Sequence, residues 1–453
     1  MTLSVEALPY HLASDALFSV LAARPWSVWL DSGRPGCESG RWDIMSCEPR
    51  VTLVTRGAVT EIRSGASVHS HADPLDLLSR QLGNEQAQHP VLPFCGGALG
   101  WFGYDLGRRF ERLPATAVDR QRLPEMAVGI YDWALLVDHE RRHTWLAGQV
   151  GRSPRARELL LGAATGDATT DHGCFEVFGP LRSSLSDADY ADRFRRVQSY
   201  IHAGDCYQVN LTRRFSVAAR GDPWHAYLEL RRRNPAPFAA YLNTPAVQVM
   251  SASPERFLRV RGGGVETFPI KGTIPRVKDF RADQQQRKAL FASTKDRAEN
   301  LMIVDLLRND LGRNCEVGSI RVPSLFSVES FADVHHLVSQ ITGRIAPGKD
   351  ALGMLRGCFP GGSVTGAPKI RAMEIIEELE DERRSLYCGS IGYLGHDGGM
   401  DTNIAIRTMV HTRGELSYWA GGGIVADSSC AAEAAELEIK ARAMREVAES
   451  FRV

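Results

Sequence analysis

The sequence predicts an α+β fold, a large mixed fold in which antiparallel β-sheets pack together and helices lie on the outside. Residues 1 to about 150 alternate short apolar runs with glycine, proline and charged breaks, which is typical of antiparallel strands with few helices. The second half contains amphipathic helices separated by strands. No fixed repeat and no regular strand–helix alternation occur, which argues against a doubly wound sheet or a barrel.

Size and charge restrict the class of protein. The 453 residues suffice for two or three domains or one large composite core. Because 54 Lys and Arg balance 54 Asp and Glu, no global field attracts nucleic acid or anionic lipid, and we expect neither nucleic acid nor membrane as partner. Nine scattered cysteines favour reduced thiols over zinc ribbons. Glu6 and Asp15 stand where a signal peptide needs cations, so we expect a cytoplasmic protein.

The first half is expected to form one β-rich domain. Strands are predicted within residues 51–65, 93–111 and 126–148. A helix follows at 154–162, and residues 162–173 contain the fewest apolar side chains, which indicates a linker. We therefore predict an N-terminal domain over residues 1–165 and a larger domain over residues 180–453.

The second domain opens with a clearly marked helix. Ser186 is its expected N-cap, Asp189 completes a capping box, and Gly204 ends it. The further elements expected are a strand at 205–217, helices at 222–233, 294–310 and 431–451, and strands at 246–260 and 417–426.

A hairpin is predicted where Gly262 and Gly263 supply the backbone freedom for a tight turn. Antiparallel partners around this turn have residue numbers that sum to 525, so Glu255 is expected to face Ile270, one residue before Lys271. The hairpin would thus bring a carboxylate close to an amine.

Lys271 has the surroundings of a nucleophilic amine. Pro269 and Ile270 precede it and Gly272 follows it, and apolar neighbours disfavour a charged ammonium. The alternative interpretation is a lysine at a strand end whose ammonium reaches water.

Two helices each carry a pair of carboxylates three residues apart. Asp296 and Glu299 form the first pair, and Glu433 and Glu436 form the second. Magnesium prefers oxygen ligands and usually keeps some water, so one or two carboxylates from each helix would suffice for Mg²⁺. The alternative is a solvated acidic face.

Two glycine-rich stretches, 359–369 and 420–427, are candidate anion cradles. The first nearly matches a phosphate loop, but Ala367 and Pro368 stand where Lys and Ser or Thr are required, so ATP binding is not expected. Ordinary turns are the alternative. Arg407, in the apolar segment 403–410 expected to be a strand, needs an anionic partner from the protein or a ligand.

His335 and His336 are adjacent, which does not suit a zinc pair. We expect that one acts in a site and that the other packs.

Taken together, nine motifs and the segment 96–111 resemble the chorismate-utilising enzymes, which include anthranilate synthases, isochorismate synthases and aminodeoxychorismate synthases. The motifs are Tyr207–Asn210, Ser253–Phe257, Pro269–Thr273, Asp296–Glu299, Arg308–Asp310, His336–Ser339, Phe359–Lys369, Ile391–Tyr393 and Ala420–Asp427. The resemblance covers nearly the whole chain.

Lys271 indicates the branch of that family. Anthranilate synthases carry Ala at this place, whereas Pro-Ile-Lys-Gly-Thr is similar to the members that aminate C4 of chorismate. The resemblance implies conversion of chorismate and ammonia to 4-amino-4-deoxychorismate, on the way to p-aminobenzoate and folate. Anthranilate formation is the enzymatic alternative. A non-catalytic chorismate sensor would require loss of a chemical residue, and Glu255, Lys271, Glu299 and Glu436 are all present.

The resemblance also implies roles for individual residues. Lys271 attacks C2 as the C4 hydroxyl leaves, Glu255 protonates that hydroxyl, and ammonia then attacks C4 and expels the lysine. Glu299 and Glu436 match the Mg²⁺ ligands, with Asp296 and Glu433 as outer candidates. The implied substrate-binding residues are Thr273, His336, Tyr393, Arg407, Gly421, Gly422, Gly423 and Lys440.

The sequence departs from the family pattern in two places. Ala434 replaces the Tyr that usually follows the first Glu of the last helix. Residues 30–32 only partly match the element of tryptophan-regulated anthranilate synthases, so feedback inhibition is not expected. A tryptophan pocket lined by Ser32, Arg41, Pro237 and Phe238 remains an expectation.

The ammonia source is expected to be a separate subunit. None of the nine cysteines lies in the Gly-x-Cys-x-Gly turn of a glutaminase nucleophile. The implied partner is a glutamine amidotransferase subunit (component II).

Overall fold

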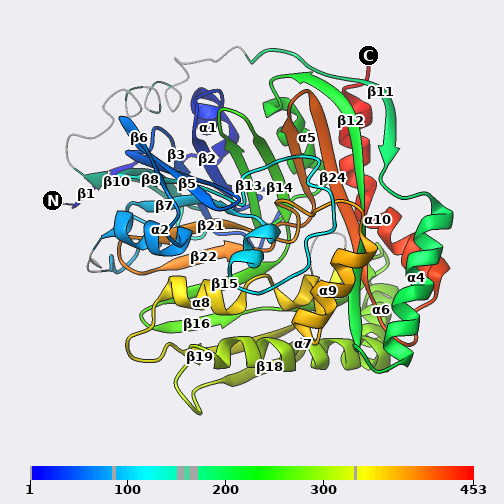
Figure 1. Ribbon diagram of the computed structural model, residues 1–453. Helices are drawn as coiled ribbons and strands as arrows, with labels where there is room; N and C mark the ends of the chain where they lie inside the picture. The colour runs from blue at the N-terminus through cyan, green and yellow to red at the C-terminus, as the bar shows by residue number, and fades with distance from the viewer. Residues whose placement is uncertain are drawn as a thin grey trace.

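Both halves of the chain contribute strands to the same two β-sheets (Figure 1). The computed structural model describes residues 3–83, 88–149, 172–330 and 334–453, together with 158, 160 and 162. Within these residues each sheet has 12 strands. The predicted α+β fold with packed antiparallel sheets is confirmed.

The first sheet follows the order β1 (Leu3–Leu8), β10 (His143–Gln149), β9 (Trp133–Asp138), β3 (Trp42–Ser46), β2 (Ser27–Asp31), β13 (Phe238–Asn243), β14 (Gln248–Ser253), β23 (Thr408–Thr412), β24 (Glu415–Ile424), β12 (Gln208–Gly221) and β11 (Phe175–Ser183), and β20 (Gly366–Ala367) pairs with β12. The second sheet follows the order β17 (Ile270–Pro275), β19 (Val334–Arg344), β16 (Gly264–Thr267), β15 (Arg256–Arg261), β22 (Met400–Asn403), β21 (Ser390–Gly395), β7 (Gly97–Phe102), β8 (Met126–Tyr131), β4 (Val51–Arg56), β5 (Val59–Ser64) and β6 (Ala66–Ser70), and β18 (Arg321–Ser330) pairs with β19.

The described α-helices are α1 (Ser14–Ala22), α2 (Pro74–Leu82), α4 (Asp187–His202), α5 (Trp224–Arg233), α6 (Phe280–Ala292), α7 (Thr294–Gly312), α8 (Ala351–Cys358), α9 (Lys369–Leu379) and α10 (Cys430–Ser450), and two 3₁₀ helices are η1 (Tyr104–Arg109) and η2 (Gly362–Val364). In Figure 1, α6 to α9 lie in the lower half, beside β16, β18 and β19, and α4 and α10 lie along one side.

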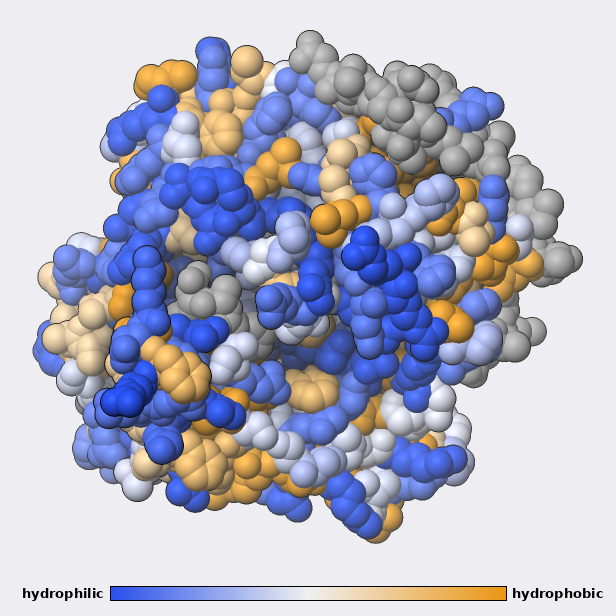
Figure 2. Space-filling view, turned by 180° about the vertical axis from the view of Figure 1, so that it is seen from behind, coloured by the Kyte–Doolittle hydropathy of each residue, from blue (hydrophilic) through white to orange (hydrophobic). Residues whose placement is uncertain are grey.

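The side-chain alternation of the strands builds three apolar cores. On β7, Leu99 and Trp101 face a core between the two sheets, whereas Ala98 and Phe102 face the opposite side of the second sheet, where α2, α7 and α8 pack. A third core lies between the first sheet and α1, α4, α5, α9 and α10. The layers are therefore helix, sheet, sheet and helix. On the face seen in Figure 2, hydrophilic side chains predominate and apolar ones form small separate patches.

The division into two domains stays a prediction. The predicted helix at 154–162 and linker at 162–173 lie almost entirely outside the described residues. Strands from both predicted domains stand next to each other in both sheets, for instance β2 beside β13 and β7 beside β21. None of the described helices has the length and apolar character needed to cross a membrane.

The capping box that marks α4 is present. The Ser186 side chain accepts a hydrogen bond from the Asp189 backbone amide, and the Asp189 carboxylate accepts one from the Ser186 amide. The other predicted helices correspond to α5, α7 and α10.

The predicted hairpin is right near its turn and wrong beyond it. Arg261 faces Gly264 and Arg259 faces Glu266, so the partner numbers do sum to 525. Ile270, however, faces Val338 of β19. The reason is that the 11-residue strand β19 is long enough to pair with β16 and then with β17, which draws β17 away from β15.

The strand predicted at 246–260 is two strands in different sheets. β14 belongs to the first sheet and β15 to the second, and the chain crosses between them at Pro254 and Glu255. The return crossing joins β22 to β23 through residues 404–407. Arg407 is therefore not in a strand, contrary to the sequence prediction, and its φ of +51° fits a bend. β22 pairs with β15 in the second sheet and β23 pairs with β14 in the first sheet. The segment 404–407 between them therefore belongs to neither sheet.

The two crossings lie side by side. The Ile404 amide donates to the Glu255 carbonyl (3.0 Å), and the Ala252 amide donates to the Arg407 carbonyl (3.0 Å). Residues 149 and 155 positions apart in sequence are thus held at one place between the sheets.

Candidate active site

Glu255 and Lys271 lie together, although not as partners in one hairpin. Glu255 is buried at the sheet crossing, and Lys271 is half-buried on β17. The Lys271 amine donates to the Ser363 carbonyl (3.2 Å), and the Ser363 hydroxyl is hydrogen-bonded to the Glu255 carboxyl group. The turn η2 therefore links the two side chains. It lies in the stretch 359–369, for which the sequence predicted an anion cradle and not such a link.

Burial favours the neutral form of both groups. It raises the pKa of Glu255 above its usual value and lowers the pKa of Lys271, although each group attracts the charged form of the other. A protonated carboxyl group and a neutral amine are the forms that a general acid and a nucleophile need.

The carboxylates of α7 and α10 approach this pair from two sides. A β-carbon built on Gly272, next to Lys271, would lie 3.0 Å from the side chain of Asp296. A β-carbon on Gly422 of β24 would lie 2.9 Å from Oε2 of Glu433. One glycine on each strand thus lets an acidic helix approach the backbone closely.

The acidic side chains also act on one another. Burial raises the pKa of Glu299, and Asp296 and Glu433 add to this effect. Burial likewise raises the pKa of Glu433. For Glu436 burial acts in the same direction, but its ion pair with Lys440 (2.6 Å) brings the pKa below the usual value.

This set of oxygen donors fits a magnesium ion that is held only partly by protein. In the described part of the chain, no three His, Cys, Asp or Glu side chains are grouped closely enough to hold a metal. Mg²⁺ is usually bound by one or two carboxylates with water and substrate oxygens, so such a closed group is not required.

Arg407 is a cation without a counter-ion among the described residues. No carboxylate of the described residues forms an ion pair with it, and burial lowers the pKa of its guanidinium. Its electrostatic partners are Tyr387 and, more weakly, Glu436. Tyr387 is buried and its ring stacks on Trp419 at 5.8 Å. A buried guanidinium in this state suits an anionic ligand.

The glycines of β24 present backbone amides on a free edge. Thr212 faces Gly421 across the ladder, but its amide donates to Glu380 (3.0 Å). Thr212 and Gly421 therefore form a pair without mutual backbone hydrogen bonds, in which the two amides point away from each other. Gly421, and Gly423 two residues on, direct their amides away from β12. The Gly421 carbonyl accepts from Lys440 (3.0 Å), and the pairing of β24 with β23 ends at Tyr418.

Gln208 adds an unsatisfied amide beside these glycines. It is 1% exposed, and neither its nitrogen nor its oxygen has a hydrogen-bond partner. A β-carbon on Gly423 would lie 2.4 Å from its nitrogen. A buried polar group without a partner is a candidate ligand contact.

The two adjacent histidines occupy different surroundings. His335 is buried, with Nε2 3.1 Å from Asp283 and Nδ1 2.7 Å from Ser330. His336 lies 2.8 Å from the Thr273 hydroxyl, and burial together with Arg407 lowers its pKa to about 4. His336 is thus a neutral side chain that faces Thr273 of β17, the strand that carries Lys271.

Comparison with known proteins agrees with this geometry. The family model of the chorismate binding enzymes matches residues 28–446. The chain belongs to that family. It is 52% identical over 425 residues to aminodeoxychorismate synthase component 1 of Klebsiella aerogenes, covering 93% of each chain. It is 41% identical over 398 residues to anthranilate synthase component 1 of Streptomyces coelicolor, covering 82% of this chain and 76% of the relative.

A solved structure supports the same fold. Anthranilate synthase component I from Streptococcus pneumoniae matches with a TM-score of 0.78 at 31% identity, covering 89% of this chain and 93% of that chain. The resemblance to the chorismate-utilising family is confirmed.

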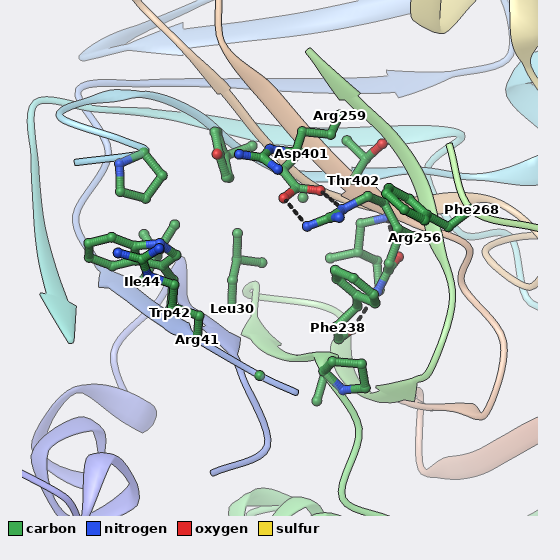
Figure 3. Close-up of a pocket in the computed structure, with 18 of the residues that line it drawn as sticks. Leu30, Arg41, Trp42, Ile44, Phe238, Arg256, Arg259, Phe268, Asp401 and Thr402 are labelled. Carbon is green, nitrogen blue, oxygen red and sulfur yellow. Dashed lines mark hydrogen bonds and ion pairs between the residues drawn. The ribbon is translucent and has the colours of Figure 1, made fainter. Parts of the chain in front are cut away.

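A second candidate site is a cavity that neither Glu255 nor Lys271 lines, although their chain neighbours Pro254, Arg256 and Ile270 do. A cavity of about 380 Å³ is lined by Arg41, Pro237 and Phe238, as expected for the predicted tryptophan pocket, whereas Ser32 is buried and does not line it. The aromatic side chains Phe238 and Phe268 lie on one side of this aromatic pocket and Trp42 on the other (Figure 3).

Tyr393 belongs to the aromatic pocket. It lines the cavity, and the charged groups that act on it are Asp401, Arg259, Arg256 and Asp397. The structure does not place it with Arg407, where Tyr387 lies instead.

Several charges in the wall of the aromatic pocket are paired. The Arg256 guanidinium donates to both oxygens of Asp401 (2.9 and 3.1 Å), as the dashed lines in Figure 3 show. Arg256 also lies 4.7 Å from the Phe238 ring and 5.5 Å from the Phe268 ring.

Proposed function

We propose that this chain is the chorismate-binding component of an aminodeoxychorismate synthase, which converts chorismate and ammonia to 4-amino-4-deoxychorismate and water. The observation that carries the proposal is the linked pair of Glu255 and Lys271, both biased toward their neutral forms. The name of the 52% identical relative supports the same activity. The product leads to p-aminobenzoate and folate.

The first chemical step forms a covalent intermediate. The neutral Lys271 nitrogen attacks C2 of chorismate, both conjugated ring double bonds shift, and the bond between C4 and its hydroxyl breaks. Glu255 supplies a proton, so that hydroxide leaves as water. The lysine nitrogen then carries the positive charge and Glu255 the negative one.

The second step releases the enzyme. Ammonia attacks C4, both ring double bonds shift back, and the electron pair of the C2–nitrogen bond returns to Lys271. Glu255 takes a proton from the new ammonium group, which restores both starting forms. Each step is an allylic displacement that needs a poor leaving group to be activated.

The remaining residues hold the two carboxylates of the substrate. Arg407, Tyr387 and the amides of Gly421 and Gly423 are proposed to bind one carboxylate. Thr273, His336 and Lys440, three further substrate-binding predictions, lie beside this set.

Magnesium is proposed to serve the other carboxylate. Glu299 and Glu436 would hold the ion, with Asp296 and Glu433 near them, and a bound Mg²⁺ supplies positive charge for an anionic substrate group. Burial, with a smaller contribution from neighbouring carboxylates, raises the pKa values of Glu299 and Glu433, and a bound cation would favour their ionised forms.

A glutamine amidotransferase subunit is proposed as the ammonia source. The relative from Klebsiella aerogenes is named a component 1, which implies a second component. The nine cysteines of this chain lie outside any Gly-x-Cys-x-Gly turn.

The aromatic pocket is proposed to hold tryptophan without feedback inhibition. Its aromatic walls and its paired Arg256 and Asp401 suit an amino acid with a large ring. A tryptophan titration followed by calorimetry, compared with Phe238→Ala, tests this role.

One product assay tests the proposed reaction. The purified chain is incubated with chorismate, Mg²⁺ and ammonium at high pH, and the products are separated by chromatography. We expect 4-amino-4-deoxychorismate. Fluorescent anthranilate as the main product would instead assign the activity named for the Streptomyces coelicolor relative.

A further inference from the structure

Ser363 is the residue that contacts both reactive side chains of the candidate active site. Its carbonyl oxygen accepts from the Lys271 amine (3.2 Å), and its hydroxyl is hydrogen-bonded to Glu255. Ser363 is 7% exposed, so bulk water does not readily replace these contacts. Neither contact was expected from the sequence.

The turn that carries Ser363 is held from several sides. Thr365 donates from its hydroxyl to the Gly361 carbonyl (3.1 Å), and its own carbonyl accepts from the Asn210 amide (2.9 Å). The buried Arg384 donates to the Val364 carbonyl (3.0 Å). The backbone of Ser363, including its carbonyl, is therefore held in place relative to β12.

Close packing removes the remaining freedom of the turn. A β-carbon on Gly361 would lie 2.5 Å from Ile404, and one on Gly362 would lie 2.6 Å from Leu306. Ile404 is part of the return crossing that also bonds to the Glu255 backbone. The turn and the Glu255 crossing thus form one packed unit.

A serine hydroxyl suits a carboxyl group that gains and loses a proton. It donates to an ionised carboxylate, and after rotation it accepts from a protonated one. A carbonyl oxygen accepts only, so it directs an N–H of Lys271 toward the turn and leaves the nitrogen lone pair free on another side.

We propose that Ser363 is a positioning residue that orients the Glu255 carboxyl group and the Lys271 nitrogen for their successive roles. This inference rests on the proposed function. Ser363 acts through Glu255 and Lys271 and not on the substrate itself.

The first test removes the hydroxyl without crowding the turn. In Ser363→Ala, kcat for chorismate consumption with free ammonium is expected to fall roughly tenfold to hundredfold, with KM for chorismate nearly unchanged, because misoriented groups slow the chemical step. Thermal unfolding of the variant should match the wild type. An unchanged kcat in Ser363→Ala would overturn the proposal.

A matched pair separates the hydroxyl from packing. Ser363→Thr and Ser363→Val add the same bulk, but only threonine keeps the hydroxyl. We expect kcat of the threonine variant to exceed that of the valine variant at least about tenfold. Equal kcat values in the pair would show that the hydroxyl has no positioning role.

The pH profile gives a readout that a structural role would not change. The hydroxyl lowers the pKa of Glu255, so Ser363→Ala should move the low-pH limb of kcat to higher pH. Lys271, Lys440 and Cys388, the other ionisable groups that act on Glu255, remain in the variant. A limb at the wild-type pH would contradict the proposal.

Chorismate consumption is measured independently of the product formed. If the wild type yields anthranilate, the proposed reaction fails, whereas the threonine–valine comparison still decides the role of Ser363.

Discussion

The candidate active site and the aromatic pocket lie in the same pair of sheets but treat buried charge differently. Around the aromatic pocket, several guanidinium groups are paired with carboxylates, as in Arg256 with Asp401 and Arg231 with Asp31. At the sheet crossing, Arg407 has no carboxylate partner within the described residues, and Glu255 and Lys271 are both biased toward neutrality.

This difference separates charges that stabilise the fold from those reserved for a ligand. A buried ion pair becomes harmful when one member is removed, because the other stays buried and charged. A buried group without a partner destabilises the fold until a ligand arrives. Substitutions in the two regions should therefore have opposite consequences for activity and stability.

The largest effect is expected at Lys271. Lys271→Ala removes the proposed nucleophile, and formation of 4-amino-4-deoxychorismate should fall by roughly 10²-fold or more, since a covalent path is lost. Ammonia that reaches C2 directly would yield some anthranilate. Chromatography of the products measures both, and the exposed Lys349→Ala is the matched control that should retain full activity.

The second effect concerns the paired charges. Arg231→Met leaves Asp31, whose side chain is 0% exposed, without its ion pair, and the free energy of unfolding should fall by about 3–5 kcal/mol. The exposed neighbour Arg232 pairs with Glu229, so Arg232→Met should change the free energy of unfolding by about 1 kcal/mol or less. Denaturant unfolding of both variants gives the comparison, and equal losses would contradict the distinction between the regions.

The third effect concerns magnesium. Glu299→Gln and Glu436→Gln should raise the Mg²⁺ concentration for half-maximal activity roughly tenfold or more and leave stability within about 0.5 kcal/mol. Glu449→Gln, on the exposed end of α10, is the control. Identical Mg²⁺ titrations of all four proteins would favour a solvated acidic face over a metal site.

The smallest effect concerns the protonation of Glu255. Its folded-state pKa is raised above the usual 4.5, so its contribution to stability is complete below pH 4.5 and is lost as the pH rises through the folded value. At pH 7 the free energy of unfolding of Glu255→Gln should therefore exceed that of the wild type by roughly 0.5–1 kcal/mol. This difference should disappear below pH 4.5. A variant less stable than wild type at pH 7 would show that Glu255 is satisfied in the fold.

The pH dependence of turnover follows from the same two shifts. A protonated Glu255 and a neutral Lys271 coexist at a constant fraction between their pKa values, so kcat should form a plateau between them. Because one pKa is raised from 4.5 and the other lowered from 10.5, that plateau should be narrower than these limits. Measurements at constant free ammonia would show it.

Local signals in the sequence were sufficient for the elements that depend on neighbours in the chain. The Ser186 capping box and the turn at Gly262 and Gly263 act within a few residues, and both are present as predicted. The layered α+β fold followed from the spacing of apolar side chains.

The rest depended on contacts between distant segments. Nothing local indicates that the run at 246–260 changes sheet at Pro254, because the strands on both sides of this residue carry buried apolar side chains. Tyr393 was assigned to the substrate site and Tyr387 was missed, since only the crossing at Arg407 shows which tyrosine lies near it. Ser363 gave no signal beyond a glycine-rich stretch.

The proposed mechanism depends most directly on a covalent bond at Lys271. The protein is mixed with chorismate and Mg²⁺ without ammonia, quenched in acid, digested and examined by mass spectrometry. The covalent mechanism predicts an adduct of chorismate less one water on the peptide that contains Lys271. This adduct should disappear when ammonia is added before the quench, and it should be absent from Lys271→Ala. An unmodified Lys271 peptide in protein that goes on to form 4-amino-4-deoxychorismate, or wild-type product formation by Lys271→Ala, would contradict it.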